Sequence, residues 1–452
     1  MRIIGLDIGT TSLSGIICDA DSGEILRTVT YANDTFLPVA QKWEKLQDPI
    51  RIISHLREMI KDLLKAGNVA AIGITGQMHG IVYLDKSGQP VSPLTTWQDG
   101  RGDQPYQHGK TYVEYLSEVT GYSLATGYGA VTHFYNSVNG LIPKSAVNFC
   151  TIHDLAVMAL TGQTQPLLNS SDAASFGLYD FKNDCFDLAA IRAIGMDPEF
   201  FPPVASGFIS AGLTPEGIPV SVAIGDNQAS VLGSVNDLDH SMLINVGTGS
   251  QISCVVSAPS SDTDIDCRPL IPGRWLLTGS SLCGGRAYAI LEEFLRQTAA
   301  LVTEQPVENA YPAMDKLMEE FVPSGQPLIV DTAFSGTRSQ PERRGKIENI
   351  SIDNLNMANL CDGVMNGMVA ELHTMYEKMK PLLKLSPTRL IGSGNGLRFN
   401  KPLAQRFSNA FGLPLSIPSH REEAAYGAAL FAMVATGIVS SVDEAQTRIQ
   451  YC

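Results

Sequence analysis

The sequence predicts an α/β protein made of two similar domains, and three observations carry this prediction. Short strand-like apolar runs alternate with longer stretches of helical periodicity, which is typical of α/β folds. A strand–turn–strand segment with a Gly-Thr turn occurs at residues 2–19 and again at residues 242–256. The 452 residues are 44% hydrophobic and 17% charged, so the chain can bury more than one core and is not globally disordered.

The first domain is predicted to begin as a β-meander and to continue with a helix and a buried strand. Residues 49–66 carry apolar side chains at helical spacing. The run 69–74 is apolar or small throughout, as in a strand covered on both faces. The strands expected before that helix are bounded by polar turns and comprise residues 2–8, 13–19 and 25–29.

The repeat puts the two Gly-Thr turns in corresponding positions. We expect two similar domains whose first turns face the same cleft, and chance similarity between short Gly/Thr hairpins is the open alternative. Only the first copy has a carboxylate beside its turn. The corresponding pairs are Gly9 with Gly247, Thr10 with Thr248, Ser12 with Ser250, and Asp7 with Asn245.

The second domain shows the same alternation of helices and strands. The domain boundary is expected in the polar stretch 237–240, which divides the chain into residues 1–237 and 238–452. Residues 424–439 are apolar, but the run is short and rich in Ala and Gly, which favours a buried helix over a membrane span. The expected elements are a helix over 357–385 broken near Pro381, a strand at 389–391, a glycine loop at 392–396 and a helix at 402–411.

Charge and cysteine usage narrow the functional classes. The formal net charge of −14 argues against nucleic acid or an anionic membrane as a partner. The eight cysteines form no CxxC pair, so we expect reduced, buried thiols and neither a disulfide framework nor a metal site. Asp7 interrupts the first apolar run, so no signal peptide is indicated. We expect a soluble, cytoplasmic protein.

The two Gly-Thr turns are candidate phosphate sites. Glycine lets backbone N–H groups approach an anion, and Thr hydroxyl groups add donors, so the pair could hold a polyphosphate. Either turn alone would be an ordinary hairpin turn. Asp7 ends a strand beside the first turn, where its carboxylate suits Mg²⁺, and a solvated turn aspartate is the alternative.

Asp226 is the strongest candidate for proton transfer. It follows an apolar strand that ends in Gly225, near the predicted domain boundary, where a carboxylate can serve as a general base in a cleft. A helix-capping aspartate is the alternative. The glycine loop at 392–396 could admit a nucleotide close to the backbone. No GxGxxG fingerprint or GxxxxGK[ST] loop is present, so an ATP site here is of another type.

Two polar loops supply candidate sugar ligands. Residues 76–80 follow the buried strand, and residues 97–101 follow a second strand. Together they provide amide, imidazole, indole, carboxylate and guanidinium groups, which suit a polyhydroxylated ligand. Packing is the alternative for Trp97, and a structural role is the alternative for His79.

Read together, these motifs resemble the FGGY carbohydrate kinases over essentially the whole chain. The resemblance implies an actin-like ATPase fold in which two ribonuclease-H-like domains flank a cleft. It also implies ATP and Mg²⁺ as cofactors and the transfer of the γ-phosphate to a terminal hydroxyl of a ketose. Residues 1–237 would form the sugar-binding domain, and residues 238–452 the nucleotide-binding domain. The motifs that carry it are residues 7–11, 76–80, 96–101, 225–228, 247–249, 392–396 and 426–429.

The resemblance also implies roles for single residues. Asp226 would be the general base, and Asp7 with Asp226 would organise Mg²⁺. Phosphate contacts would come from Thr10, Thr11, Gly247 and Thr248, and the adenosine site from Gly285, Gly394 and Asn395. The sugar would be held by Gln77, Met78, His79, Trp97, Asp99, Asp226 and Asn227.

The sequence indicates the identity of the sugar acceptor and the oligomeric state less clearly than it indicates phosphoryl transfer. Residues 125–129, 151–154, 172–177 and 392–396 resemble the family members that act on sedoheptulose, whereas the loop 77–80 is shared with those that act on xylulose. A xylulose or other polyol kinase is therefore an alternative, and a non-enzymatic actin-like nucleotide-binding protein is a rival from another class. A homodimer is a hypothesis that the sequence leaves open.

Overall fold

The computed structural model describes residues 1–260, 265–323, 325–337, 340 and 342–452. The chain forms two compact units. Unit 1 comprises Met1–Asn236, Arg268–Arg274 and Glu422–Ile449, and unit 2 comprises Asp237–Cys267, Trp275–Arg421 and Gln450–Cys452. The division at residues 237/238 expected from the sequence differs from these units at Asp237, which belongs with unit 2, and in two segments, 268–274 and 422–449, which belong with unit 1.

Unit 1 is built on a seven-stranded mixed sheet in the order β13-β14-β5-β1-β2-β3, with β15 paired to β5. β1, β2 and β3 form the expected antiparallel meander, and β5 runs parallel to β1. The strands are β1 (Arg2–Ile8), β2 (Ser12–Asp19), β3 (Ile25–Ala32), β5 (Ala71–Gly76), β13 (Ser210–Leu213), β14 (Pro219–Ser221) and β15 (Ile224–Gly225).

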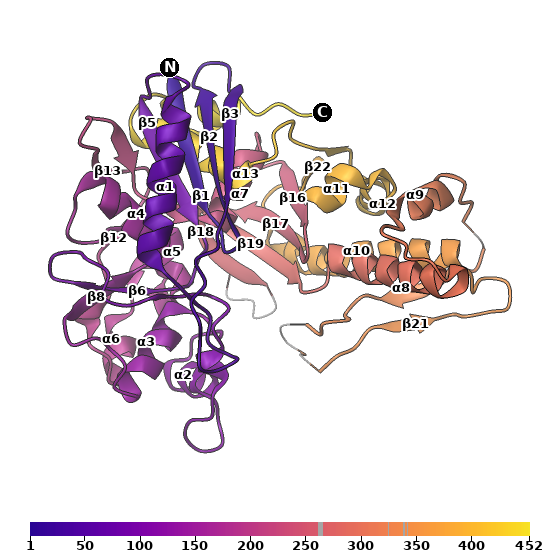
Figure 1. Ribbon diagram of the computed structural model, residues 1–452, viewed down its shortest axis with the longest axis horizontal. Coiled ribbons are helices and arrows are strands. Elements are labelled where there is room, and N and C mark those ends of the chain that lie inside the picture. Colours follow the sequence, from indigo (N-terminus) through magenta and orange to yellow (C-terminus); the bar gives the residue numbers. More distant parts are fainter. Residues whose placement is uncertain (261–264, 324, 338–339, 341) are drawn as a thin grey trace. The chain divides into compact units, whose positions relative to one another are not determined.

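Helices cover both faces of this sheet (Figure 1). α1 (Pro49–Leu64) and α4 (Ile152–Thr161) pack on one face, where Met59 and Leu63 lie against Gly15. α13 (Glu423–Ala435) packs on the other face together with α7 (Asp226–Ser234). A Cβ on Gly5 would lie only 1.9 Å from the carbonyl oxygen of Ala425, so glycine is required for this close packing. The Ala/Gly-rich run 424–439 therefore contains a buried helix, as expected, and this helix packs on the sheet of unit 1.

Smaller elements complete unit 1. They are β4 (Leu46–Gln47), β6 (Val82–Asp85), β7 (Leu94–Thr95), η1 (Gly100–Asp103), α2 (Tyr112–Thr120), α3 (Gly129–Val138), β8 (Ala146–Cys150), β9 (Leu168–Asn169), α5 (Ser170–Ser175), β10 (Tyr179–Asp180), β11 (Cys185–Phe186), α6 (Leu188–Ala193), η2 (Pro198–Phe200), β12 (Val204–Ala205) and α14 (Val442–Gln446).

Unit 2 repeats the strand pattern of unit 1. The sheet order is β18-β19-β17-β16-β22-β23. β16 and β17 form a hairpin, β19 continues antiparallel, and β22 runs parallel to β16, as β5 does to β1. The two-domain repeat predicted from the Gly-Thr turns is thus confirmed. The strands of this sheet are β16 (Ser241–Val246), β17 (Ser250–Val256), β18 (Asp266–Ile271), β19 (Arg274–Ser281), β22 (Arg389–Ser393) and β23 (Leu415–Ser416). Residues 268–271 of β18 and Arg274 of β19 are counted with unit 1 in the division above.

One detail of the predicted repeat is wrong by a single residue. Ile8 pairs with Leu13 in the first hairpin, whereas Val246 pairs with Ser250 in the second. Ser250 therefore corresponds to Leu13 and not to Ser12, because the first turn is one residue longer.

The helices of unit 2 pack around its sheet and surround a core rich in Met and Leu. The long helix predicted over 357–385 ends at Met379, and a 3₁₀ turn that contains Pro381 follows, which confirms the predicted break. The elements are α8 (Gly285–Thr303), α9 (Tyr311–Glu319), β20 (Ile329–Asp331), β21 (Lys346–Glu348), α10 (Met357–Met379), η3 (Lys380–Leu382), α11 (Asn395–Phe399) and α12 (Lys401–Phe411).

Two expectations about the chain as a whole can be compared with the structure. In the described part of the chain, no helix combines the length and the apolar character needed to cross a membrane. All eight cysteines are free thiols. Five are buried as expected and Cys267 is half-buried, whereas Cys185 and Cys452 are exposed and depart from the prediction.

Candidate functional site

Three parallel strand ends bring Asp7 and Asp226 to the same edge of the sheet in unit 1. Gly76, the last residue of β5, pairs with Ile8 of β1 on one side and with Gly225 of β15 on the other. Asp7 therefore precedes one neighbour of Gly76, and Asp226 follows the other. Asp226 is the first residue of α7, whose capping position is occupied by Gly225, so the capping role considered from the sequence does not apply.

Both carboxyl groups are half-buried and electrostatically coupled. Burial and the charge of Asp226 raise the pKa of Asp7 to about 7, and the charge of Glu422 acts in the same direction. Its Oδ1 atom is buried and has no hydrogen-bond partner among the described residues. Burial also raises the pKa of Asp226, while the charge of His153 opposes that rise. The unpartnered oxygen of Asp7 and the nearby carboxylate of Asp226 are ligands that suit a hard divalent cation.

A buried ion pair that the sequence did not reveal lies next to these carboxylates. Nε2 of His153 and Oδ1 of Asp172 are 2.9 Å apart, and both side chains are fully buried. Burial alone would lower the pKa of His153, but the charge of Asp172 and the hydrogen bond raise it to about 9. A Cβ on Gly76 would lie 3.0 Å from Nδ1 of His153, so the ring of His153 packs against the end of β5.

Asp154 completes this buried group. Burial and the charge of Asp172 raise the pKa of Asp154 to about 8. Asp154 also forms a capping box with Thr151 at the start of α4. The spacing Thr-x-x-Asp could have indicated this helix start, but nothing in the sequence pairs His153 with α5. His153, Asp154 and Asp172 also offer ligand atoms within 4.8 Å of one another.

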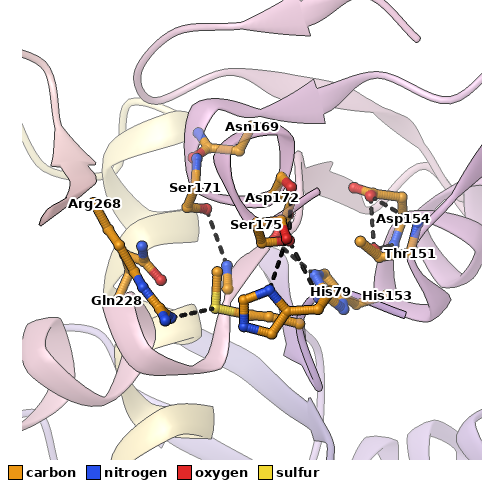
Figure 2. A network of polar contacts seen from close by, with 12 residues as sticks. His79, Thr151, His153, Asp154, Asn169, Ser171, Asp172, Ser175, Gln228 and Arg268 are labelled. Atoms are coloured by element: carbon orange, nitrogen blue, oxygen red, sulfur yellow. Dashed lines mark hydrogen bonds and ion pairs between the residues drawn. The ribbon is translucent and has the colours of Figure 1, made fainter. Parts of the chain in front are cut away.

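His79 is held in a strained conformation beside an aromatic ring. Its φ of 73° lies in the left-handed region, which non-glycine residues rarely adopt. Nδ1 lies 2.7 Å from the carbonyl oxygen of Ser175, and since a carbonyl can only accept, Nδ1 carries the proton. The imidazole stacks on Tyr128 with ring centroids 4.6 Å apart. Tyr128 was not singled out as a site residue from the sequence. Figure 2 shows Arg268 and Gln228 on one side of His79 and His153 on the other, with Ser175 and Asp172 above it in this view.

Met78 packs directly against the residue before Asp226. A Cβ on Gly225 would lie 2.5 Å from both Sδ and Cε of Met78, so the glycine lets the Met78 side chain pack closely against the start of α7. The Gly225 N–H donates to Oγ of Ser171 at 3.0 Å, which fixes the start of α7. Asn227 is the next residue of this helix and is half-buried. Met78, Asp226 and Asn227 thus lie within one local cluster.

The first Gly-Thr turn is tied to both candidate sugar loops. The indole Nε1–H of Trp97 donates to Oγ1 of Thr10 at 2.9 Å, and the Thr10 hydroxyl donates to Oε1 of Gln77 at 3.2 Å. Gln77 is buried and donates in turn to Gln47, which donates to the Thr10 carbonyl. Trp97 is 44% exposed, so its ring is available to a ligand while its N–H holds the turn. Thr11 is exposed beside it.

Asp99 is engaged within the protein. Its side chain is fully buried, and its two oxygens accept hydrogen bonds from the Arg101 guanidinium and from the Lys45 N–H. Arg101 also donates to Asn136 at 2.5 Å. The ion pair therefore organises the loop that carries Trp97.

Unit 2 brings its three glycine segments together at the end of β16. The Gly285 N–H donates to the Gly247 carbonyl at 2.9 Å, and the Arg286 N–H donates to the Thr248 carbonyl. Gly394 has a φ of 81°, and a Cβ there would lie 2.6 Å from the carbonyl oxygen of Val246. Gly247, Thr248 and Asn395 are exposed. The described residues predicted to bind phosphate and adenosine in this unit are thus neighbours.

The groups that each unit presents suit the transfer of a phosphoryl group to a hydroxyl group. Unit 1 presents two coupled carboxylates beside a histidine, an indole and amide groups, which can bind and deprotonate a polyol. Unit 2 presents exposed backbone groups in a Gly-Thr turn at the start of α8, a 19-residue helix whose dipole favours anions.

Comparison with known proteins agrees with this chemistry. Residues 2–233 match the model of the FGGY family of carbohydrate kinases, N-terminal domain, and residues 242–436 match the corresponding C-terminal domain. A sedoheptulokinase from Mus musculus is 28% identical over 94% of this chain and 96% of the relative.

Solved structures show the same architecture. A gluconate kinase from Lactobacillus acidophilus superposes with a TM-score of 0.86 at 20% identity, covering 100% of this chain and 92% of that one. A xylulose kinase from the same organism superposes with a TM-score of 0.84 at 20% identity, with the same coverage. The actin-like ATPase fold predicted from the sequence is confirmed.

Proposed function

The chain belongs to the FGGY family of carbohydrate kinases, and from that premise we propose that it transfers the γ-phosphate of ATP to a terminal hydroxyl of a ketose, with sedoheptulose preferred. Family membership makes the protein an ATP-dependent sugar phosphotransferase and sets aside the non-enzymatic actin-like rival. The 28% identity to a sedoheptulokinase over nearly the full length supports the choice of acceptor. Xylulose is the alternative, because xylulose kinases share the fold.

The observation that carries the mechanism is the position of Asp226 at the start of α7, against Met78 and next to the strand end of Asp7. Asp226 accepts the proton of the acceptor hydroxyl as the hydroxyl oxygen attacks the γ-phosphorus, and the bond between that phosphorus and the β–γ bridging oxygen breaks to release ADP. Burial raises the pKa of Asp226, which makes its carboxylate a better base, and the charge of His153 opposes that rise. General-base assistance of this kind is worth about 10²–10⁴ in rate.

The sugar is held by the loops around this base. The exposed face of Trp97 and the stacked His79 give the sugar apolar and hydrogen-bonding surfaces, and Met78 and Asn227 flank the reacting hydroxyl. Gln77 and Asp99 belong to the same proposed site, and their hydrogen bonds within the protein fix its two loops.

The nucleotide is held through the two Gly-Thr turns. Thr10 and Thr11 in unit 1 and Gly247 and Thr248 in unit 2 contact phosphate oxygens in this proposal. The glycine segments that meet at the end of β16 bind the adenosine through Gly285, Gly394 and Asn395. Phosphoryl transfer depends chiefly on positioning and charge stabilisation, which such backbone cradles supply.

The carboxylates of Asp7 and Asp226 fit a magnesium ion. The buried, unpartnered Oδ1 of Asp7 and the second carboxylate beside it are oxygen ligands of the kind that Mg²⁺ prefers. When bound, the ion neutralises charge on the phosphate oxygens during transfer.

The proposed activity is tested by ADP release coupled to a reporter reaction, across C3 to C7 polyols and ketoses and gluconate. We expect the highest kcat/KM with sedoheptulose. A clear preference for xylulose would contradict the proposed acceptor, and a preference for gluconate would contradict the ketose class. Absence of turnover with every acceptor would contradict the proposed function.

A further inference from the structure

Arg268 brings a positive charge to the residues around Asp226. It begins the segment Arg268–Arg274, which belongs to unit 1 although the residues on either side of it belong to unit 2. Gln228, two residues after Asp226 on α7, is fully buried, and its Nε2–H donates to the Pro269 carbonyl at 2.9 Å. This hydrogen bond fixes the backbone next to Arg268 relative to the start of α7. Arg268 is therefore placed by the same helix that carries the proposed base.

The guanidinium of Arg268 extends to the loop proposed to bind the sugar. Its Nη1 lies 4.0 Å from Sδ of Met78, the atom that also packs against Gly225. Figure 2 shows Arg268 alongside Gln228 and reaching toward the area of His79. Its charge also acts on Asp226, where it opposes the rise in pKa that burial causes, after the charge of His153 and the hydrogen bond from the Asn227 N–H.

A guanidinium beside a carboxylate is well matched to neighbouring oxygens of a sugar. The carboxylate of Asp226 can only accept from a hydroxyl, whereas the guanidinium can only donate, and its planar fork can reach two adjacent oxygens. Two vicinal hydroxyls can therefore be bound at once, one by each group.

We propose that Arg268 binds the acceptor sugar, donating hydrogen bonds to the oxygen next to the hydroxyl that Asp226 deprotonates. This inference rests on the proposed function and deepens it, because it predicts that the enzyme requires an oxygen on the carbon adjacent to the phosphorylated one. Arg268 is then a specificity-determining residue.

Arg268→Met tests the inference in the full-length protein. Calorimetry measures the Kd of sedoheptulose and of ADP, and steady-state assays measure kcat and KM. Loss of a hydrogen bond from a charged donor should raise the sugar Kd and lower kcat/KM by about 10- to 100-fold. The ADP Kd should stay within about twofold of wild type. An unchanged sugar Kd and kcat/KM would overturn the inference.

A matched control and a modified sugar sharpen the test. Arg274→Met removes the same side chain from the same segment, but Arg274 pairs with exposed Asp443 at 3.5 Å, so sugar binding should not change. Wild type should prefer sedoheptulose over its 6-deoxy analogue, and Arg268→Met should lose that preference. An equal preference for sedoheptulose over the 6-deoxy analogue in both proteins would contradict the proposal that Arg268 binds that oxygen.

Two further measurements distinguish a failure of this inference from an unfolded variant and from a failure of the proposed function. Arg268→Gln is the second variant if circular dichroism shows that Arg268→Met is unfolded, and it should weaken sugar binding in the same way. A glutamine variant that binds sedoheptulose as tightly as wild type would overturn the inference. If wild type itself binds no sedoheptulose, the proposed function fails, and the inference fails with it.

Discussion

The substitution Asp172→Asn should remove a charge-dependent part of the stability of unit 1. Asparagine keeps an oxygen that accepts the Nε2–H of His153, so the shape and the hydrogen bond are conserved while the negative charge is lost. Without that charge, burial should lower the pKa of His153 and favour the neutral ring. The change therefore separates the electrostatic contribution of the pair from its packing.

The expected magnitude follows from the pKa of His153. A rise from 6.5 to about 9 corresponds to roughly 3 kcal/mol of stabilisation. Because the pKa is raised in the folded state, this stabilisation is fully present below pH 6.5 and is lost as the pH rises to about 9. Asp154, whose pKa burial and the charge of Asp172 raise to about 8, adds a fall in stability with rising pH at the lower end of the same window. Wild type should thus lose stability across this window, and Asp172→Asn should have a flatter profile.

Urea unfolding from pH 6 to pH 9.5 measures this effect. A Trp275→Phe background leaves Trp43 and Trp97, both in unit 1, as the fluorescent reporters. Asp172→Asn should cost about 3 kcal/mol at pH 6 and much less at pH 9.5. The control Asp34→Asn removes an exposed ion pair with Arg51 and should cost less than about 1 kcal/mol throughout. An unchanged pH profile in Asp172→Asn would refute the charged-pair interpretation.

Two other substitutions test the metal and nucleotide assignments. Asp7→Asn should raise the Mg²⁺ concentration needed for half-maximal rate by about 10-fold, because the buried Oδ1 loses its charge; an unchanged Mg²⁺ titration would count against a metal role. Gly394→Ala should weaken ADP binding in calorimetry by about 10-fold, because its Cβ would lie 2.6 Å from the Val246 carbonyl oxygen. Gly412→Ala is the control, since Gly412 also has a positive φ but nothing within 4 Å of its Cβ, and an equal loss in both variants would argue against the crowding.

The parts of the fold that depend on local pattern could be predicted from the sequence. The hairpins at residues 2–19 and 242–256 follow from alternating apolar runs around Gly-Thr turns, and the break after Met379 follows from Pro381. Asp7 and Asp226 were recognisable because each is close to the end of a strand. Parallel pairing of β1, β5 and β15 then brings such positions to one edge.

The parts of the fold and of the site that depend on contacts between segments distant in sequence could not be predicted. Apolar periodicity shows that residues 424–439 are buried but not which sheet covers them, and close packing at Gly5 puts α13 on the sheet of unit 1. Arg268 is likewise distant in sequence from the helix that anchors its segment. His153 and Asp172 meet only because α4 and α5 pack beside the strand ends. The burial of Asp99 could not be predicted either, because the sequence of a loop does not show that its carboxylate will pair with the guanidinium of Arg101.

Asp226→Asn is the most direct test of the proposed mechanism. The variant keeps the size of the side chain and removes the proton acceptor at the start of α7. Calorimetry should find that ATP and sedoheptulose still bind, while coupled ADP release with sedoheptulose should fall by about 10²–10⁴. Turnover close to that of wild type, with both ligands bound, would contradict the assignment of Asp226 as the general base.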